Sequence, residues 1–336
     1  MRTILIGGYY GAGNLGDEAI LECMLKDMRA LRSDLHFIVT SWNPTKTAQT
    51  FDVESVHWQD ISALLEAGKR ADLILLGGGG LFQDYWGIDP DTYLRRTAFT
   101  ITTYGSLPLL AKLLGIPCMI YAQGVGPLKS ESAQEHVRLA FERCQVITLR
   151  DEESLTLLQR CGFSPSAAQT VEITADPAFT LEIDSSARQQ AEDILAQEGI
   201  PLGTNLISVS LRYWDLSTES AEWLSGVAAG LNAYLAKDSR AHILFLPFQI
   251  DARTPYTDDR PTLQQVRAQV FYPERTHLIE GEISPRCMQA VFERSALVIG
   301  MRLHALILAI NAGVPIIALP YDSKVTSLLR QLHLEE

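Results

Sequence analysis

The sequence predicts an α/β protein built from two doubly wound, Rossmann-like domains that face each other across a cleft. Short apolar runs, typical of buried parallel strands, alternate along the chain with segments whose apolar residues recur every three or four positions, as on a helix face. The length of 336 residues is too great for one ordinary core and suits two α/β domains. We expect the domains to span residues 1–183 and 184–336.

The composition limits the possible partners. Hydrophobic residues make up 47% of the chain and charged residues 20%, as in a globular protein, and the net charge of -12 argues against nucleic acid as a partner. An anionic substrate would therefore need a local basic pocket. The five cysteines are scattered and never form a C-x-x-C pair, so we expect reduced thiols and a cytoplasmic protein.

The first strand, expected at residues 3–6, leads into a glycine-rich turn. Gly11, Gly13 and Gly16 match the spacing G-x-G-x-x-G. A dinucleotide site also needs an acidic residue at the end of the next strand to hold the ribose, and that strand ends in Thr40. We therefore expect these glycines to let the backbone approach an acceptor molecule instead.

Two polar residues of this turn are candidate site residues. Asn14 and Asp17 precede a segment with helical apolar spacing and can hydrogen-bond an acceptor, Asp17 being a candidate general base. The alternative is a glycine turn in which Asp17 caps the helix.

A second glycine turn follows the strand expected at residues 71–76. It begins GGGG and carries Asp84, a second candidate base, at the same sheet edge. The next region, residues 92–114, has helical character, with Arg95, Arg96 and Lys112 among apolar residues and a break expected at Pro108. It either touches a membrane surface or a lipid-linked substrate, or packs between helices.

Arg150 ends the strand expected at residues 146–149, where it can face a ligand. The alternative is a surface ion pair with Asp151 or Glu153.

The C-terminal stretch of residues 296–325 reads as strand, helix and strand. Apolar runs at 296–299 and 316–319 flank a segment of helical spacing that ends at Gly313, so we expect the two strands to pair in parallel. Both strand ends then point to one crevice.

Charged side chains follow each of these strands. Arg302 and His304 come after the first strand, at a helix start where backbone N–H groups favour an anion, and Lys324 comes after the second. Ligands of open α/β sheets bind beyond the carboxyl ends of strands, so these residues predict a pocket for a small, highly charged anion. The alternative is that the two cations are solvated and His304 packs in the core.

Several stretches resemble one family: GNLGDEAIL, LGGGGLFQD, AQGVGPL, LRDEES, ADPAF, SVSLR, GMRLHALILA and PYDSKV. They are similar, over nearly the whole chain, to the polysaccharide pyruvyl transferases, in particular the branch that pyruvylates bacterial cell-surface polymers. The resemblance implies a fold like the two-domain B-type glycosyltransferases, phosphoenolpyruvate as co-substrate and a sugar hydroxyl pair as acceptor. It also implies donor-site roles for Arg150, Arg302, His304 and Lys324.

The implied reaction fits an anion pocket. Phosphoenolpyruvate carries a phosphate and a carboxylate on three carbons, which Arg and Lys bind well. His304 suits either a general acid or a phosphate donor, and Asp17 or Asp84 a base. No cluster of His, Cys and carboxylate residues has metal-ligand spacing, so we expect neither metal nor cofactor.

Two other functions stay open. A B-type glycosyltransferase using a nucleotide sugar would share the fold, but a ribose-binding acid and a base-stacking loop are not evident. A non-catalytic, anion-binding protein of an envelope pathway would need no acceptor groove. The acceptor expected here is a glycan or lipid-linked saccharide, met in the cytoplasm or at the inner face of the cell membrane.

Overall fold

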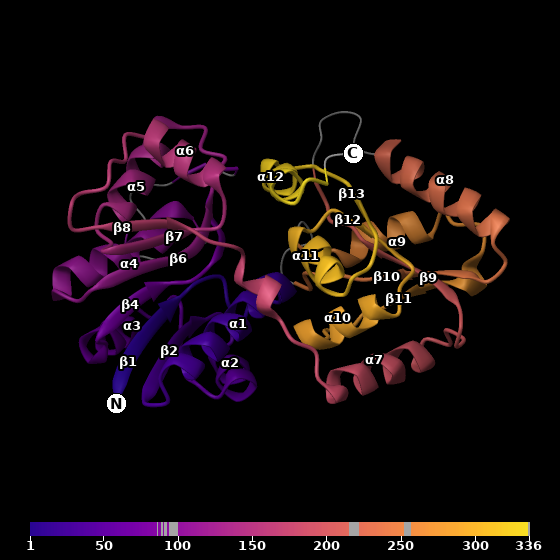
Figure 1. The fold of residues 1–336 in the computed structure, drawn as a ribbon, viewed down its shortest axis with the longest axis horizontal. Helices are drawn as coiled ribbons and strands as arrows, with labels where there is room; N and C mark the ends of the chain where they lie inside the picture. The colour runs from indigo at the N-terminus through magenta and orange to yellow at the C-terminus, as the bar shows by residue number, and fades with distance from the viewer. Residues whose placement is uncertain are drawn as a thin grey trace. The chain divides into compact units, whose positions relative to one another are not determined.

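The computed structural model describes residues 1–85, 87, 88, 90, 93, 100–214, 222–251 and 257–334. The chain forms two compact units, coloured along the chain from indigo to yellow in Figure 1. Unit 1 consists of Met1–Ala12 and Ile20–Pro177, and unit 2 of Gly13–Ala19 and Ala178–Glu336. The short segment 13–19, which our sequence analysis placed in the first domain, thus groups with unit 2. Arg95 and Arg96 lie outside the described residues.

Unit 1 is built on an eight-stranded parallel sheet of order β3-β2-β1-β4-β6-β7-β8, with β5 pairing to β6 off this path. The strands are β1 (Arg2–Gly7), β2 (Leu35–Ser41), β3 (Glu54–His57), β4 (Leu73–Leu76), β5 (Gly79–Phe82), β6 (Cys118–Val125), β7 (Val146–Leu149) and β8 (Thr170–Ile173). The helices are α1 (Leu15–Leu31), whose first residues up to Ala19 group with unit 2, α2 (Pro44–Phe51), α3 (Ile61–Arg70), α4 (Ile101–Leu114), α5 (Glu131–Phe141) and α6 (Glu152–Arg160).

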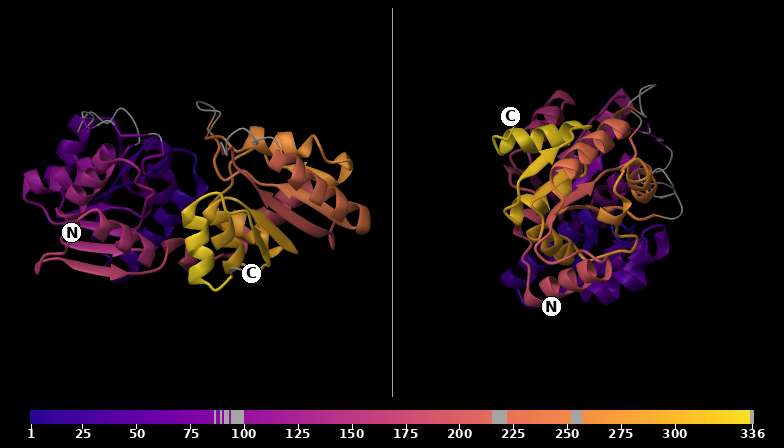
Figure 2. Two further views of the ribbon diagram at one scale, coloured as in Figure 1. Left: turned by 90° about the horizontal axis from the view of Figure 1, so that it is seen from above. Right: turned by 90° about the vertical axis from the view of Figure 1, so that its right-hand side faces the viewer.

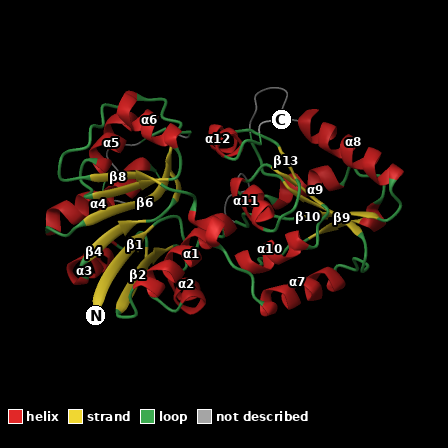
Figure 3. Cartoon of the chain, viewed as in Figure 1, coloured by secondary structure: helices red, strands yellow, loops and turns green. Residues whose placement is uncertain are grey.

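Helices cover both faces of this sheet, as Figure 3 shows. The alternation of side chains along β1 explains the two layers: Leu5 joins a core with α3, α4, α5 and α6, whereas Ile4 and Ile6 join a core with α1 and α2. Burying each such side chain contributes about 1.5–3 kcal/mol. Because the strands of such a sheet are buried on both faces, successive residues are apolar, and these continuous apolar runs are the signal from which the strands were predicted.

Unit 2 has a five-stranded parallel sheet of order β11-β10-β9-β12-β13. Its strands are β9 (Asn205–Ser210), β10 (Ala241–Phe245), β11 (Thr276–Leu278), β12 (Leu297–Gly300) and β13 (Ile316–Ala318). Its helices are η2 (Pro177–Thr180), α7 (Ser185–Gln197), α8 (Glu222–Lys237), α9 (Arg260–Arg267), η3 (Pro273–Arg275), α10 (Pro285–Glu293), α11 (Leu303–Asn311) and α12 (Ser323–Gln331). The turned views show α11 and α12, both yellow, next to each other beside the strands (Figure 2).

The C-terminal prediction of strand, helix and strand is confirmed. β12 and β13 pair in parallel, with Val298 opposite Ile316, and α11 connects them. Leu303 and residues 305–309 of α11 are buried, which is why its sequence is apolar all round. Asp322 caps α12 by accepting a hydrogen bond from the backbone N–H of Lys324 at 3.1 Å, which fixes where that helix begins.

Four details differ from the sequence prediction. The strands β3 and β8 were not predicted, because their sequences ESVH and TVEI are half polar, and β3 is only half-buried while β8 is mostly exposed. The second glycine turn contains the short strand β5. No break occurs at Pro108, which lies inside the continuous helix α4.

The cysteines are free thiols, as predicted. Among the described residues, no helix is long and apolar enough to span a membrane.

Candidate active site

The carboxyl edge of the unit 2 sheet gathers the polar residues of the candidate site. The chain builds this sheet outward from β9, first through β10 to β11 and then on the other side through β12 to β13. The connections therefore diverge between β9 and β12, which is the switch point where α/β sheets bind ligands. Arg212 follows β9, Arg302 and His304 follow β12, and Lys324 comes after β13.

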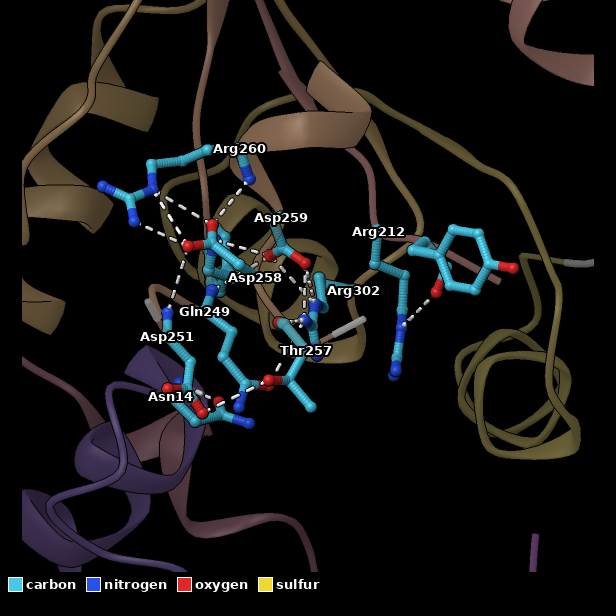
Figure 4. Close-up of polar contacts among 12 residues, drawn as sticks. Asn14, Arg212, Gln249, Asp251, Thr257, Asp258, Asp259, Arg260 and Arg302 are labelled. Carbon is cyan, nitrogen blue, oxygen red and sulfur yellow. Dashed lines mark hydrogen bonds and ion pairs between the residues drawn. The ribbon is translucent and has the colours of Figure 1, made fainter. Parts of the chain in front are cut away.

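Arg302 is buried and points at a carboxylate of its own unit. Its Nη2 lies 2.5 Å from Oδ1 of Asp259, and its Nε lies 3.1 Å from Oδ2. Nη2 also contacts Oε1 of Gln249 and the backbone oxygen of Thr257, both at 3.3 Å (Figure 4). This two-pronged ion pair holds the guanidinium plane in one orientation.

Asp259 also fixes the loop after β10. Its Oδ2 accepts hydrogen bonds from the backbone N–H groups of Phe248 and Gln249, each at 2.9 Å. The same loop binds the glycine-rich N-terminal turn, because Leu15 donates to the oxygen of Phe248 at 2.8 Å and Ile250 donates to that of Gly13 at 3.0 Å. These backbone bonds explain why residues 13–19 belong to unit 2.

Asn14 belongs to the same junction. Its backbone forms a β-bridge with Gln249, and its Oδ1 accepts a hydrogen bond from the N–H of Gly16 at 3.0 Å (Figure 4). Asn14 therefore orders the start of α1, and the substrate role assigned to it stays a prediction.

His304 lies in the first turn of α11, against the glycine turn. A Cβ added to Gly16 would overlap the imidazole at Nδ1, so only glycine fits at position 16 beside this ring. Asp17, buried in the first turn of α1, is the next residue along the chain. Unit 2 thus holds an imidazole and a carboxylate residue on neighbouring helix starts.

Lys324 and Arg212 converge on Tyr321. The Lys324 Nζ is 3.2 Å from Oδ2 of Asp322 and 5.7 Å from the Tyr321 ring centroid. Nη1 of Arg212 donates to the Tyr321 hydroxyl at 3.2 Å. Burial alone would raise the pKa of that hydroxyl, but the charges of Lys324, Arg212 and Arg302 lower it. The three cations therefore outweigh the nearby carboxylate of Asp322 at the position of this hydroxyl.

Arg150 follows β7 in unit 1, at the carboxyl edge of that sheet. It is buried, and its Nη1 lies 3.0 Å from Oδ2 of Asp176 while Nε lies 3.7 Å from Asp151. Its guanidinium covers Gly124, where a Cβ would lie 2.5 Å from the Arg150 Nε. Arg150 therefore stands at the predicted sheet edge with carboxylates beside it.

Asp84 has a structural environment. Its carboxylate accepts hydrogen bonds from the backbone N–H groups of Lys129 and Ser130 at 2.8 Å and from the Ser130 hydroxyl at 3.1 Å. These bonds order the start of α5. Of the two candidate bases, Asp17 is the one in the unit that contains His304, so we favour Asp17.

Sequence reasoning missed Asp259 and gave Arg212 no role. Asp259 carries no signal of its own, since it does not directly follow a strand. Arg212 stands in the stretch SVSLR and follows β9 directly, so the strand-end rule that selected Arg302 would have found it.

A family model described as polysaccharide pyruvyl transferase matches residues 14–323 of the chain. The chain belongs to the polysaccharide pyruvyl transferase family. It is therefore a transferase of polysaccharide biosynthesis, as the motifs predicted. It is 23% identical over 371 residues to the amylovoran biosynthesis protein AmsJ of Erwinia amylovora, covering 100% of this chain and 87% of AmsJ.

Solved structures share the fold of this chain. The UDP-GlcNAc 2-epimerase of Methanocaldococcus jannaschii superposes with a TM-score of 0.65 at 12% identity, covering 100% of this chain and 87% of the epimerase. That of Neisseria meningitidis gives 0.63 at 14% identity, with 98% and 85% covered. The Escherichia coli ADP-heptose heptosyltransferase II gives 0.51 at 13% identity, with 97% and 87% covered. The predicted two-domain, Rossmann-like fold of B-type glycosyltransferases is confirmed.

Proposed function

We propose that this member of the family uses phosphoenolpyruvate as donor and forms a pyruvate ketal on a hydroxyl pair of a cell-surface glycan or its lipid-linked precursor. The observation that carries the proposal is the positive edge of the unit 2 sheet, where Arg212, Arg302, Lys324 and His304 follow three strands around the switch point. A three-carbon donor with a phosphate and a carboxylate needs such a concentration of positive charge.

The reaction requires one proton to be added and one to be removed in its first step. An acid protonates carbon three of the donor, and carbon two becomes the cationic centre that the first sugar hydroxyl attacks. His304 is our candidate for the acid, and Asp17 for the base that takes the proton of that hydroxyl. Phosphate then leaves carbon two, the second hydroxyl attacks that carbon and closes the ring, and the proton of this hydroxyl passes to the released phosphate.

Arg150 has a separate place in this proposal. It stands at the carboxyl edge of the unit 1 sheet, with its guanidinium against Gly124. We assign it to the anionic donor, as the family resemblance implies, with Asp176 holding its guanidinium in orientation.

The test uses the purified chain with phosphoenolpyruvate labelled in carbon three and a panel of aryl glycosides and lipid-linked saccharides. We expect phosphate release that depends on the acceptor, together with transfer of the label into a ketal product. Donor binding should weaken as salt rises, because the contacts are electrostatic. Tight binding of a nucleotide sugar, with none of phosphoenolpyruvate at low salt, would support a glycosyltransferase instead.

A further inference from the structure

Arg212 differs from the other cations of the site in its partners. Arg302 is paired with Asp259, Arg150 with Asp176, and Lys324 with Asp322. Among the described residues, no carboxylate lies within ion-pair distance of Arg212. We propose that Arg212 binds the carboxylate of the donor, and that Arg302 is a positioning residue that organises the pocket through Asp259. This inference rests on phosphoenolpyruvate being the donor.

The Arg212 guanidinium is held in place by neutral groups. Its central carbon lies 4.9 Å from the ring centroid of Trp214 and 5.3 Å from that of Tyr321. Nη1 donates to the Tyr321 hydroxyl at 3.2 Å, and Nε to the backbone oxygen of Tyr213 at 3.3 Å. Aromatic contacts of this kind orient a guanidinium without neutralising its charge.

Arg212 has N–H groups left that can donate hydrogen bonds to a ligand. A guanidinium has five N–H groups, and these two hydrogen bonds use two of them. A partly buried cation without a counter-ion is costly, and the cost is recovered when an anion binds. Arg212 is also outside the network around Asp259 in Figure 4, so a ligand can reach it without breaking the Arg302 ion pair.

Topology places Arg212 where the donor is expected. Ser210 of β9 pairs with Gly300 of β12, so the residues that follow these two partners border one crevice. Arg212 comes two residues after Ser210, and Arg302 two residues after Gly300. This crevice is the switch point of the sheet, and a small ligand there would lie between Arg212 and the start of α11.

The two anionic groups of the donor suit two different parts of this crevice. The start of α11 has no side-chain cap, and its backbone N–H groups together with His304 suit the oxygens of a phosphate. The flat edge of a guanidinium suits a planar carboxylate, to which it donates two parallel hydrogen bonds. We therefore assign the carboxylate to Arg212 and the phosphate to the His304 side.

The experiment compares two ligands and three proteins by calorimetry without acceptor. Phosphoenolpyruvate and vinyl phosphate differ by the carboxylate alone. The proteins are the wild type, Arg212→Gln, and the control Arg188→Ala, which removes an exposed arginine paired with Glu293 in the same unit. Arg212→Gln should weaken phosphoenolpyruvate binding by about 10- to 100-fold, the usual loss for charge-assisted hydrogen bonds, and leave vinyl phosphate binding unchanged.

The outcomes separate this inference from the proposed function. Equal losses for both ligands would place Arg212 at the phosphate, and no loss for either would remove it from the pocket; each overturns the inference while the donor stands. A wild type that binds neither ligand overturns the donor and the inference together. Thermal unfolding checks the fold, and Arg212→Lys, which keeps the charge without the planar fork, should recover only part of the affinity.

Discussion

The imidazole of His304 lies directly against the α-carbon of Gly16, so that no side chain fits at position 16 without moving the ring. Gly16→Ala should therefore displace His304. A displacement of about 1 Å in a catalytic group costs roughly 10²-fold in rate, and we expect a turnover loss of about that size. Steady-state kinetics with saturating phosphoenolpyruvate would measure it.

The control for Gly16→Ala is Gly226→Ala on α8. A Cβ at position 226 meets no atom within 4 Å, and Ala favours a helix interior over Gly by about 0.5–1 kcal/mol. This variant should keep wild-type turnover and unfold at a slightly higher temperature. Normal turnover in Gly16→Ala would show that the position of the His304 ring does not matter for the reaction.

The second prediction separates proton transfer from binding at His304. If the imidazole protonates the donor, His304→Ala lowers turnover by about 10²- to 10⁴-fold even at saturating donor. His304→Gln keeps a hydrogen-bond donor but does not titrate, so it should be nearly as slow and should lose one limb of the pH–rate profile. Wild-type turnover and pH profile in His304→Gln, with a raised KM for the donor, would leave His304 a binding residue only.

The buried strands and the charged residues at their ends could be predicted from the sequence. Apolar runs mark buried parallel strands, so β12 and β13 and their parallel pairing were predictable, as were Arg302, His304 and Lys324 at the strand ends. β3 is half-buried, β8 is mostly exposed, and both carry polar residues, so their sequences have no such signal. The pattern of apolar residues in a strand depends on its burial. A strand that is hydrogen-bonded but exposed therefore carries no such pattern.

Contacts between residues far apart in the chain could not be predicted from the sequence. Gly13 and Leu15 bond to the backbone of residues 248–250, a contact that no local pattern encodes. Asp259 and Arg302 are also far apart in the chain, and their ion pair forms only in the folded unit. Sequence reasoning therefore found the cations of the site but not the acid that orients one of them.

The third prediction concerns the buried pair of Arg302 and Asp259. Removing one partner of a buried ion pair costs about 3–5 kcal/mol, because the other charge stays buried. Asp259→Leu should cost more than Arg302→Met, because Asp259 also accepts two backbone hydrogen bonds. The double variant should lose less than the sum, with a coupling of up to about 3 kcal/mol in urea unfolding.

An exposed pair is the matched control for that cycle. Arg188 and Glu293 are joined by two hydrogen bonds at 2.8 and 3.0 Å but are partly exposed, so their coupling should stay below about 1 kcal/mol. Equal coupling in the two cycles would mean that burial adds nothing to the Arg302 pair. Its role as a positioning contact would then have no energetic basis.

The last prediction is a loss of stability in mild acid, caused by two histidines on adjacent strands. Nδ1 of His242 on β10 lies 3.0 Å from Nε2 of His277 on β11, with nearly parallel rings. Burial lowers the pKa of both imidazoles, and for His277 the neighbouring His242 lowers it further. Histidine in the unfolded chain titrates near 6.5, so as the pH falls through that value the unfolded state binds protons that the folded state does not, and stability falls.

We expect the melting temperature to drop between pH 8 and pH 5.5, with about 2–4 °C for each kcal/mol lost in a domain of this size. His277→Asn should reduce that drop, whereas His333→Asn, at an exposed position with φ of 55° that Asn tolerates, should leave it unchanged. An unchanged drop in His277→Asn would assign the acid sensitivity to other groups.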